Sequence, residues 1–358
     1  MFKRLKKAII NKKANTGKEV YGSEFLYKNN DVQIVSDACK ICWNTKGYDT
    51  YESKCTYIAK RIKTGHESVI EHSNIIIQIV LPVKNMEDVL EFLSAAHYLN
   101  CKARVFEENI YLLLGGSIRG YKEAFRNIIN MSNLVISFLK NEFYLNLDKC
   151  YFGDFIEDGI MKESMFGYYP DEDTEAGKCN HYNSSDEERV NIVNVDNIDT
   201  VASKMWNVFT YDDLMDMCTV TIIFDKMSRI ITQQLTRHRN GITQESARYV
   251  DMSGVKFNSP ELFTDKYKEK KYKVSLLGDE KLSLQEIGDK ITTIYSELRD
   301  QGLLKQDARG YLPQNYSSGR IYMTFTYRHL LKFLSLRTDK AAQPEIRQYA
   351  LIIEDALD

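Results

Sequence analysis

The amino-acid sequence predicts a protein of the α+β class. Two short runs rich in Ile and Val, residues 73–82 and 218–224, have the length and composition of strands. Apolar residues recur at helical spacing over residues 31–64 and over segments near the C-terminal end. The order of helices, strand, long intervening segment, strand and helices favours α+β over a regular alternation. No internal repeat is evident in the sequence.

The first half of the chain is expected to begin with helices and to continue through one strand. Helices are predicted over 31–64, and the strand at 73–82 stops at Pro82, which lacks a backbone donor. Residues 86–146 look helical in the main. Residues 150–200 are acidic and rich in Asn and Ser, which is typical of a surface excursion.

The second half is expected to open with the strand 218–224, which leads into a helix over 226–236. Residues 262–282 are rich in Lys and Glu, so we expect a solvated face or a loop. Thr326 is placed to cap one further helix, and Pro344 fits the first turn of another. These later helices are predicted over 284–304, 327–336 and 344–357.

Composition and charge exclude some classes of protein. The net charge of −2 gives no overall basic footprint of a nucleic-acid binder. No apolar run approaches the roughly 20 residues of a membrane-spanning helix, and the apolar stretch within residues 1–13 is too short for a signal peptide. Seven scattered cysteines suit free thiols in a reducing cytosol, and Cys39 and Cys42 are expected to pack rather than to bind metal.

The most informative polar pattern begins at the end of the predicted helix 226–236. Gln234, Arg237 and His238 are spaced to share one helix face. Arginine is costly to bury unless an anionic group pairs with it. This face therefore indicates a phosphate, a carboxylate or an electron-rich ring as the bound group.

The pattern continues after a turn, where Gln244, Ser246 and Arg248 alternate and would point to one side of an extended segment. A guanidinium binds phosphate bidentately, and a neighbouring hydroxyl can complete an oxyanion cradle. Arg237, Ser246 and Arg248 thus indicate a nucleotide-phosphate site. The alternative is a solvated helix end with surface salt bridges.

A second polar cluster, Gly65-His66-x-Ser68-x-x-Glu71-His72, directly precedes the first strand. Its two His and one Glu lack the spacing of a helical zinc site, so a hydrogen-bonded structural or cofactor contact is favoured over metal. A third cluster near the C-terminal end holds Arg309, Arg328, Lys332 and Arg337. Arg337 follows an apolar helix, so it pairs with a carboxylate or contacts a ligand.

Together these clusters resemble the flavin-dependent thymidylate synthases, the ThyX family. The signature of that family, Arg-His-Arg followed after a spacer by Ser-x-Arg-Tyr, appears as Arg237-His238-Arg239 and Ser246-Ala247-Arg248-Tyr249. The stretch at 65–72 is similar to the upstream motif of the family. The stretch Ala342 to Arg347, with the third cluster, is similar to its C-terminal block.

The resemblance implies a ThyX-like fold, with a central antiparallel sheet flanked by helices. It also implies reductive methylation of dUMP to dTMP, with methylenetetrahydrofolate as carbon donor, NADPH as reductant and FAD as cofactor. No enzyme nucleophile is needed. The implied assembly is a homotetramer with sites at subunit interfaces. No metal and no nucleic acid are expected, and the expected location is the cytoplasm, or the host cytoplasm for a viral chain.

The resemblance assigns roles residue by residue. Arg337 matches the arginine that assists ionisation of the uracil ring, and a guanidinium beside a ring carbonyl favours the anionic ring. Glu71 lies in the same motif as a flavin contact. The implied FAD-binding residues are Ser68, Arg237, His238, Arg239, Gln244, Thr326, Arg328 and Lys332. The implied dUMP-binding residues are Gln234, Arg237, Gln244, Ser246, Ala247, Arg248, Arg309 and Arg337.

The sequence departs from the pattern of the family in five places. The spacer between Arg239 and Ser246 is one residue shorter than usual, which shortens the loop that must wrap both ligands. Gln244 stands where many members have Glu, and Thr326 replaces an Asn. Lys332 and Ala341 also differ from the usual residues. These changes alter the hydrogen-bond inventory around flavin and base.

The departures leave two alternatives to a thymidylate synthase. One is a related enzyme that methylates or hydroxymethylates another pyrimidine deoxynucleotide, such as dCMP. The other is a catalytically silent nucleotide-binding homologue. The whole chain, 1–358, is predicted to be one catalytic domain, with a core of 31–82 and 217–358 and a mostly helical insertion at about 83–216.

Overall fold

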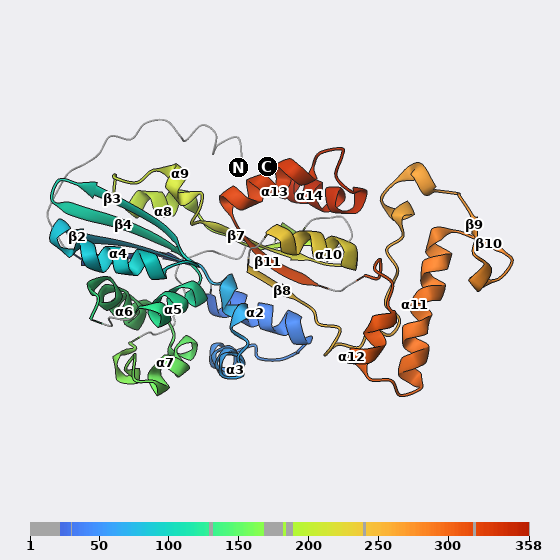
Figure 1. The fold of residues 1–358 in the computed structure, drawn as a ribbon, viewed down its shortest axis with the longest axis horizontal. Helices are drawn as coiled ribbons and strands as arrows, with labels where there is room; N and C mark the ends of the chain where they lie inside the picture. The colour runs from blue at the N-terminus through green and yellow to red at the C-terminus, as the bar shows by residue number, and fades with distance from the viewer. Residues whose placement is uncertain are drawn as a thin grey trace.

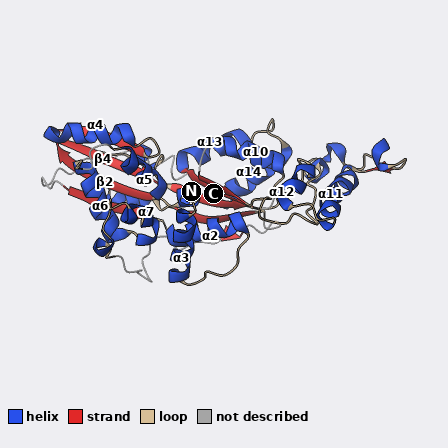
Figure 2. Cartoon of the chain, turned by 60° about the horizontal axis from the view of Figure 1, so that its bottom comes forward, coloured by secondary structure: helices blue, strands red, loops and turns tan. Residues whose placement is uncertain are grey.

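The computed structural model describes residues 22–29, 31–128, 132–167, 182–183, 189–238, 241–317 and 320–357. Two antiparallel sheets lie side by side in the elongated molecule, with helices on both faces (Figures 1 and 2). Helices and antiparallel strands are both present, so the predicted α+β class is confirmed.

The first sheet has four strands in the order β1-β2-β4-β3, each antiparallel to its neighbours. Nearly every residue of β2 is buried, because the Ile and Val side chains of this strand are covered on both faces. The predicted strand at 73–82 is therefore confirmed. The strands are β1 (Gly22–Lys28), β2 (Ile75–Pro82), β3 (Asn100–Phe106) and β4 (Asn109–Gly116).

The second sheet has five strands in the order β5-β6-β7-β11-β8, again all antiparallel. The predicted strand at 218–224 corresponds to β7 and is confirmed. The strands are β5 (Tyr182–Asn183), β6 (Val190–Val195), β7 (Thr219–Phe224), β8 (Gly241–Gln244) and β11 (Ile321–Thr326). A small separate hairpin is formed by β9 (Tyr272–Lys273) and β10 (Lys281–Leu282).

The predicted helices in 31–64, 284–304, 327–336 and 344–357 are all present. The hydroxyl of Thr326 accepts a hydrogen bond from the His329 N–H at 3.3 Å, as expected of a helix cap. The longer helices are α2 (Asp31–Trp43), α3 (Tyr51–Lys63), α4 (Met86–Ala95), α5 (Ile118–Asn127), α6 (Leu134–Asn146), α11 (Leu284–Asp300), α13 (Tyr327–Arg337) and α14 (Pro344–Leu357). The shorter ones are α7 (Gly153–Glu157), α8 (Ile198–Lys204), α9 (Tyr211–Leu214), α10 (Arg229–Leu235), α12 (Lys305–Ala308), and the 3₁₀ turns η1 (Glu67–His72) and η5 (Thr236–His238).

One stretch differs from the prediction. The β3–β4 hairpin interrupts residues 86–146, which were expected to be helical in the main. The apolar run of β4 is short and carries no period that separates a buried strand from a buried helix. At the turn of this hairpin, Glu107 has a φ of 53°, the left-handed conformation that tight hairpin turns require.

The helices cover the two sheets in a related manner. The helices α4, α5 and α6 lie on one side of the first sheet and α8 and α9 on the other, while α13 and α14 lie on one side of the second sheet and α2 on the other (Figure 1). Buried apolar residues form two large clusters. One contains residues of α2, α4, α5 and α6, and the other contains residues of α8, α9, α13 and α14. Neighbouring residues of β2 belong to different clusters: Ile75 and Ile77 to one, Ile76 to the other.

The two sheets also share one chain path, although no repeat is evident in the sequence. In each, a first strand is followed by helical segments, a central strand, a helix, the far strand, a second central strand and a further helix. In the second sheet, the β9–β10 hairpin, α11 and α12 are inserted between the far strand β8 and the central strand β11. The first strand of each path, β1 or β6, carries an irregularity against its central partner, between Phe25 and Tyr27 in β1 and between Ile192 and Asn194 in β6. The short strand β5 pairs with the other side of β6. The structure thus contains two units of similar topology.

The long segment between the two predicted core parts contributes to both sheets. It supplies β3 and β4 to the first sheet and β6 to the second. The limits of an insertion at about 83–216 remain a prediction. Part of the expected surface excursion at 150–200 lies outside the described residues. Among the described helices, none has both the length and the apolar character that crossing a bilayer requires.

Candidate functional site

The motif at 65–72 ends in a buried histidine that ties the two sheets together. His72 lies at the end of η1, and its Nδ1 is 3.0 Å from the hydroxyl oxygen of Thr324 on β11. Its Nε2 is 2.8 Å from the hydroxyl oxygen of Thr243 on β8. Burial lowers the pKa of His72 to about 3, so the ring is neutral. With both ring nitrogens engaged by hydroxyls, His72 is a structural bridge rather than a metal ligand.

Glu71 lies one residue earlier, at the edge of a cavity between the sheets. Its carboxylate pairs with the guanidinium of Arg119, near the start of α5. Burial raises the pKa of Glu71, while Arg119 opposes this shift. The cavity measures about 400 Å³, and its lining includes Glu71, Arg119, Gly241, Thr326 and His329. Residues from both units therefore face one space.

Gly241 brings the start of β8 against η1. A Cβ added at this position would lie 2.9 Å from the backbone oxygen of Glu71, a distance shorter than the contacts that Cβ atoms make in proteins. Only a residue without a side chain permits this approach. The chain that leaves the Arg-His-Arg segment is thereby held against the motif at 65–72.

A cationic group, His238, His329, Lys332 and Arg337, lies where η5 meets α13. The ring of His238 stands edge-on to Phe333 of α13, with centroids 5.2 Å apart. Burial lowers the pKa of His238, and the positive charges of Arg337, His329 and Lys332 lower it further. Like charges repel in such a group unless an anion joins them.

Two atoms of this cationic group are buried without a partner. Neither Nε2 of His238 nor Nε of Arg337 has a hydrogen-bond partner among the described residues. A buried donor without a partner costs about 1–3 kcal/mol. The orphaned atoms and the surplus of positive charge fit an anionic ligand, such as a phosphate or an ionised ring.

The segment Ser246-Ala247-Arg248 lies against another part of the first unit. The backbone N–H of Ser246 donates to the carbonyl of Cys42 in α2 at 3.4 Å. The hydroxyl of Ser246 accepts from the backbone N–H of Arg248 at 3.3 Å, so it shapes the turn. Arg248 is exposed, with its guanidinium 5.5 Å from the ring centre of Tyr249. This side chain is free to meet a ligand from solvent.

Arg309 lies near Tyr316, which belongs to a small apolar cluster that also packs against Ala247. Its Nε donates to the carbonyl of Gln306 at 3.1 Å, and the side chain is otherwise exposed. Burial raises the pKa of Tyr316, and the charges of Arg229 and Arg309 act against that rise. The backbone N–H of Arg229 also donates to the carbonyl of Tyr316 at 3.2 Å.

Other predicted site residues are placed differently. The amide of Gln234 donates to that of Gln343 at 2.7 Å. Arg328 is held by Asp216 and, at 3.1 Å, by Asp212. Gln244 ends β8 and is half-buried. Arg237, Lys332 and Ser68 are exposed. Arg239 lies outside the described residues.

Two residues of the site were not predicted from the sequence. Arg119 and His329 are named in none of the three polar clusters of the sequence. The signal that could have found Arg119 is its place two residues after a capping serine, because Arg328 stands two residues after the capping Thr326.

The cysteines show one cluster that the sequence did not indicate. The ligand atoms of Cys55, Asp148 and Cys150 lie within 4.8 Å of one another. Tyr51 donates to Asp148 at 2.9 Å, and burial raises the pKa of the Cys150 thiol. A thiol that keeps its proton is a poor metal ligand. Cys39 is fully buried, and burial raises its pKa to about 12, in line with the packing role expected of it.

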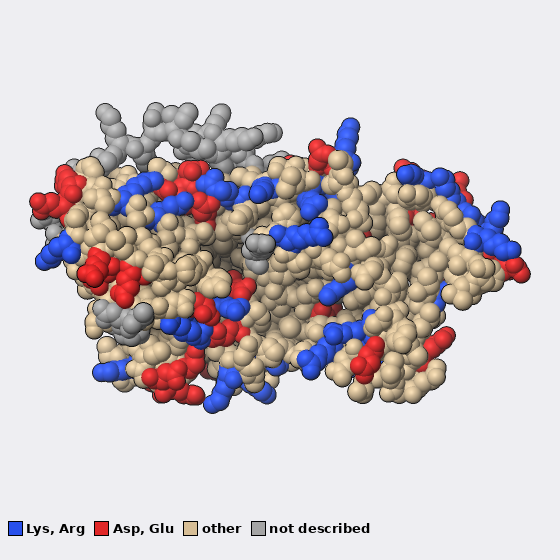
Figure 3. All heavy atoms as spheres, viewed as in Figure 1, with Lys and Arg blue, Asp and Glu red and all other residues tan. Residues whose placement is uncertain are grey.

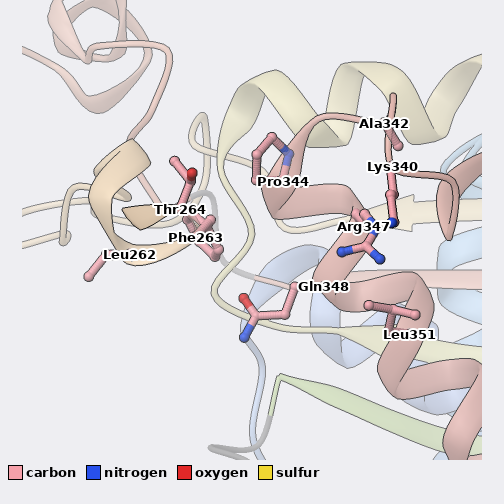
Figure 4. A pocket seen from close by; sticks show the side chains of 9 residues that line it. All are labelled: Leu262, Phe263, Thr264, Lys340, Ala342, Pro344, Arg347, Gln348 and Leu351. Atoms are coloured by element: carbon pink, nitrogen blue, oxygen red, sulfur yellow. The ribbon is translucent and has the colours of Figure 1, made fainter. Parts of the chain in front are cut away.

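A second cavity, of about 490 Å³, lies between the loop before η7 (Asp265–Tyr267) and the start of α14. Figure 4 shows Phe263 and Thr264 on one side and Arg347 and Leu351 on the other, with Gln348 extending between them. None of the predicted site residues lines it. The candidate site is therefore the junction of η1, η5, β8 and α13.

Comparison with known proteins identifies the family. The sequence profile of the family described as "Thymidylate synthase complementing protein" matches residues 171–357. The chain is 36% identical over 130 residues to a protein named flavin-dependent thymidylate synthase from Thermosipho africanus, covering 34% of this chain and 56% of that protein.

Two further relatives carry the same name. The protein from Aquifex aeolicus is 34% identical over 134 residues, covering 35% of this chain and 41% of its own length. That from Pyrococcus furiosus is 31% identical over 143 residues, covering 40% and 55%. The chain spans about half the length of the curated relatives it matches. Because the family profile covers more than half of this chain, including its cationic group and the 246–248 segment, the chain belongs to the thymidylate synthase complementing protein family.

Proposed function

We propose that this chain is a flavin-dependent thymidylate synthase. It converts dUMP to dTMP, with methylenetetrahydrofolate as the carbon donor, NADPH as the source of reducing equivalents and FAD as the bound cofactor. Three relatives that share 31–36% identity with parts of the chain carry this activity in their names. Family membership supports a methyltransferase of this kind.

The cationic group carries the proposal. Four basic side chains converge on one place, and the buried Nε2 of His238 and Nε of Arg337 lack partners among the described residues. The ligands of the proposed reaction are anionic: the nucleotide through its phosphate and its ionised uracil ring, the flavin through its diphosphate. Guanidinium and imidazole N–H groups match such oxygens in charge and geometry.

Arg337 has the most direct role in the proposal. Its guanidinium, at the last residue of α13, lies beside the uracil carbonyl and favours the ring without its N3 proton. The ionised ring is more nucleophilic at carbon, so no covalent bond to the enzyme is needed. When bound, the flavin supplies the hydride.

The other site residues hold ligands in this proposal. Ser246, Ala247, Arg248 and Arg309, with Gln234, contact the nucleotide. Ser68, Arg237, His238, Arg239, Thr326, Arg328 and Lys332 contact the flavin, and Gln244 contacts both. Arg328 is already paired with Asp216 and Asp212. Its contact with flavin therefore requires that one of these partners be shared or released.

The decisive experiment combines colour and turnover. Purified protein should show the visible absorption of bound flavin, and it should form dTMP from dUMP, methylenetetrahydrofolate and NADPH. Colourless protein that takes up no added FAD would contradict the proposal. Flavin-bound protein that acts on dCMP and not on dUMP would leave the cofactor in place but replace the substrate.

A single substitution tests the position of the site. Arg237→Ala is expected to weaken flavin and nucleotide binding together, because both ligands meet the Arg-His-Arg segment in this proposal. Arg299→Ala, on α11 and paired with Asp251, is the matched control and should bind both ligands as the unaltered chain does. Unchanged binding by Arg237→Ala would place the site elsewhere.

The assembly and location stay predictions from the resemblance: a homotetramer in the cytoplasm that binds no nucleic acid. On the face seen in Figure 3, basic and acidic side chains are intermixed, which supports small-molecule ligands over a nucleic-acid backbone. Sedimentation of the purified protein measures the assembly directly.

A further inference from the structure

The two units match in their hydrogen bonds as well as in their chain paths. Asn29, just after β1, donates its N–H to the carbonyl of Asn74, and its side-chain oxygen accepts from the N–H of Asn74, both at 3.0 Å. Asp196, just after β6, has the same two bonds with Thr219, at 2.9 and 2.6 Å. Asn74 and Thr219 therefore hold equivalent places at the start of the central strands.

Each unit also contains one ion pair at an equivalent position. Arg119 stands two residues after the capping Ser117, and Arg328 two residues after the capping Thr326. Each guanidinium binds the acid three residues before the equivalent Asn74 or Thr219, namely Glu71 and Asp216. So many equivalent contacts are expected only if the two units have the same fold.

The contacts between the units are equivalent too. Gly241, the first residue of β8, lies against the backbone of Glu71. Asn100, the first residue of β3, donates its amide to the backbone carbonyl of Asp216 at 2.6 Å. Each unit thus places the turn before its central strand against the far strand of the other. The chain has two equivalent junctions.

We propose that the chain is a covalently joined pair of equivalent units, and that its ligand site is composite within one chain. The first unit supplies η1 with Glu71, and the second supplies the cationic group of η5 and α13. The equivalent junction, where β3 meets Asp216, has lost its site. This inference rests on the proposed function for the identity of the ligand as a flavin.

The residues at the second junction carry the argument for its loss. Counted from the equivalent caps, Lys332 corresponds to Glu123 and Arg337 to Ile128, which is buried. His329 corresponds to Gly120, and the bridging His72 to Met217. Positive charge is thus replaced by an acid, an apolar side chain and a glycine. Such a set cannot hold the anionic groups of a flavin or a nucleotide.

On this proposal the predicted insertion has a different meaning. The strands β3 and β4 and the helices α4 and α5 complete the first unit, and β6 opens the second. The segment 83–216 is then half of one unit joined to the beginning of the next. With one site lost, the first unit contributes only η1 to the remaining site, together with the elements that hold η1 in place.

Complementation between two defective variants tests the proposal. Glu71→Ala removes the partner of Arg119 on η1, the turn whose Ser68 contacts the flavin in the proposed function. Arg237→Ala alters η5 of the second unit, and each variant alone should weaken FAD binding at least ten-fold. Glu71→Gln, which preserves side-chain size, replaces Glu71→Ala if circular dichroism shows that the latter fails to fold. The two variants are co-expressed with different tags, and protein that carries both tags is purified.

The flavin content of this mixed protein decides the outcome. A site within one chain always keeps one defect, so flavin should stay at the level of the single variants. If no protein with both tags forms although each variant folds, the chains do not associate. This outcome supports a site within one chain and contradicts the predicted homotetramer. Flavin restored toward the unaltered level would show that sites form between chains and would overturn the proposal.

A matched pair of histidines tests the loss of the second site. His97 lies three residues before β3, as His238 lies three residues before β8. His238→Ala should weaken FAD binding, whereas His97→Ala should leave it unchanged. Equal losses in both variants would overturn the proposal. An unaltered chain that binds no flavin would instead contradict the proposed function, and the composite flavin site would fall with it.

Discussion

The imidazole of His72 and the hydroxyl of Thr324 lie 3.0 Å apart in the interior, joining η1 of the first unit to β11 of the second. The hydroxyl of Thr324 also lies 2.9 Å from that of Thr221 on β7. The ring of His72 stands edge-on to Tyr322, with centroids 4.9 Å apart. A neutral, fully buried histidine therefore positions the acidic motif beside the candidate site.

The bridge predicts a loss of stability in mild acid. Burial holds the pKa of His72 at about 3 in the folded chain, against about 6.5 when unfolded. Between these values the unfolded chain binds more protons, so the free energy of unfolding falls as the pH is lowered. The contribution of His72 is at most about 1.4 kcal/mol per pH unit.

Urea unfolding of the unaltered chain and of His72→Gln between about pH 6.5 and about pH 5 measures this effect, because the other groups that titrate there are common to both proteins. His72→Gln keeps a polar side chain but cannot bind the proton. The number of protons that this variant takes up on unfolding should therefore be lower by close to one, which makes its free energy of unfolding depend less on pH. Identical slopes for the unaltered chain and His72→Gln would show that this histidine does not titrate as buried.

Gly241→Ala is expected to destabilise the junction of the two units. The added Cβ would lie 2.9 Å from the backbone oxygen of Glu71, so one backbone must shift, at a cost of about 1–3 kcal/mol. Flavin binding should weaken as well, because β8 follows the Arg-His-Arg segment. Chemical denaturation and flavin titration measure the two effects.

Gly153→Ala is the control for this substitution. No atom lies within 4 Å of the position of its Cβ, and Gly153 is the first residue of α7. Its stability should stay within about 0.5 kcal/mol of the unaltered chain. Equal stabilities of the two alanine variants would mean that the contact at Gly241 relaxes freely.

Asp196 is expected to be among the most sensitive buried positions. Its carboxylate accepts from the hydroxyl of Tyr27 at 2.8 Å, the amide of Asn74 at 2.7 Å, and both the N–H and hydroxyl of Thr219. Asp196→Ala leaves several buried donors unpaired and should lower the free energy of unfolding by about 3–5 kcal/mol.

Asp199→Ala provides the comparison for Asp196→Ala. Asp199 is exposed and accepts a hydrogen bond from the hydroxyl of Tyr211 at 2.8 Å. Its loss should change stability by no more than about 1 kcal/mol. Thermal unfolding of both variants gives the difference, and similar midpoints would argue against Asp196 as the centre of the network.

Elements with a clear period or a capping signal could be predicted from the sequence. The helix after Thr326 and the buried strand β2 are examples. The hairpin β3–β4 could not, because its apolar run is short and fits either structure. The repeat of the two units was hidden because equivalent contacts use different residues, such as Asn29 in one and Asp196 in the other.

The candidate site shows the same limit. The Arg-His-Arg and Ser-x-Arg-Tyr motifs are local, so their residues could be found without a structure. The pairing of Arg119 with Glu71 depends on strand register, because β4 must pair with β2 before α5 can reach η1. Which residues are orphaned, such as His238 and Arg337, also depends on packing that the sequence does not display.

Arg337→Lys is expected to lower turnover more than nucleotide binding. A lysine keeps the positive charge, so the dissociation constant of dUMP should change by no more than roughly three-fold, whereas kcat should fall by roughly ten-fold or more. The physical reason is geometric: an ammonium cannot reproduce the planar fork that stabilises an ionised ring. Equilibrium binding and steady-state dTMP formation give the two numbers. Arg299→Lys, far away on α11, should alter neither. If Arg337→Lys weakens binding as much as it slows turnover, Arg337 holds the nucleotide in the ground state and does not favour ring ionisation.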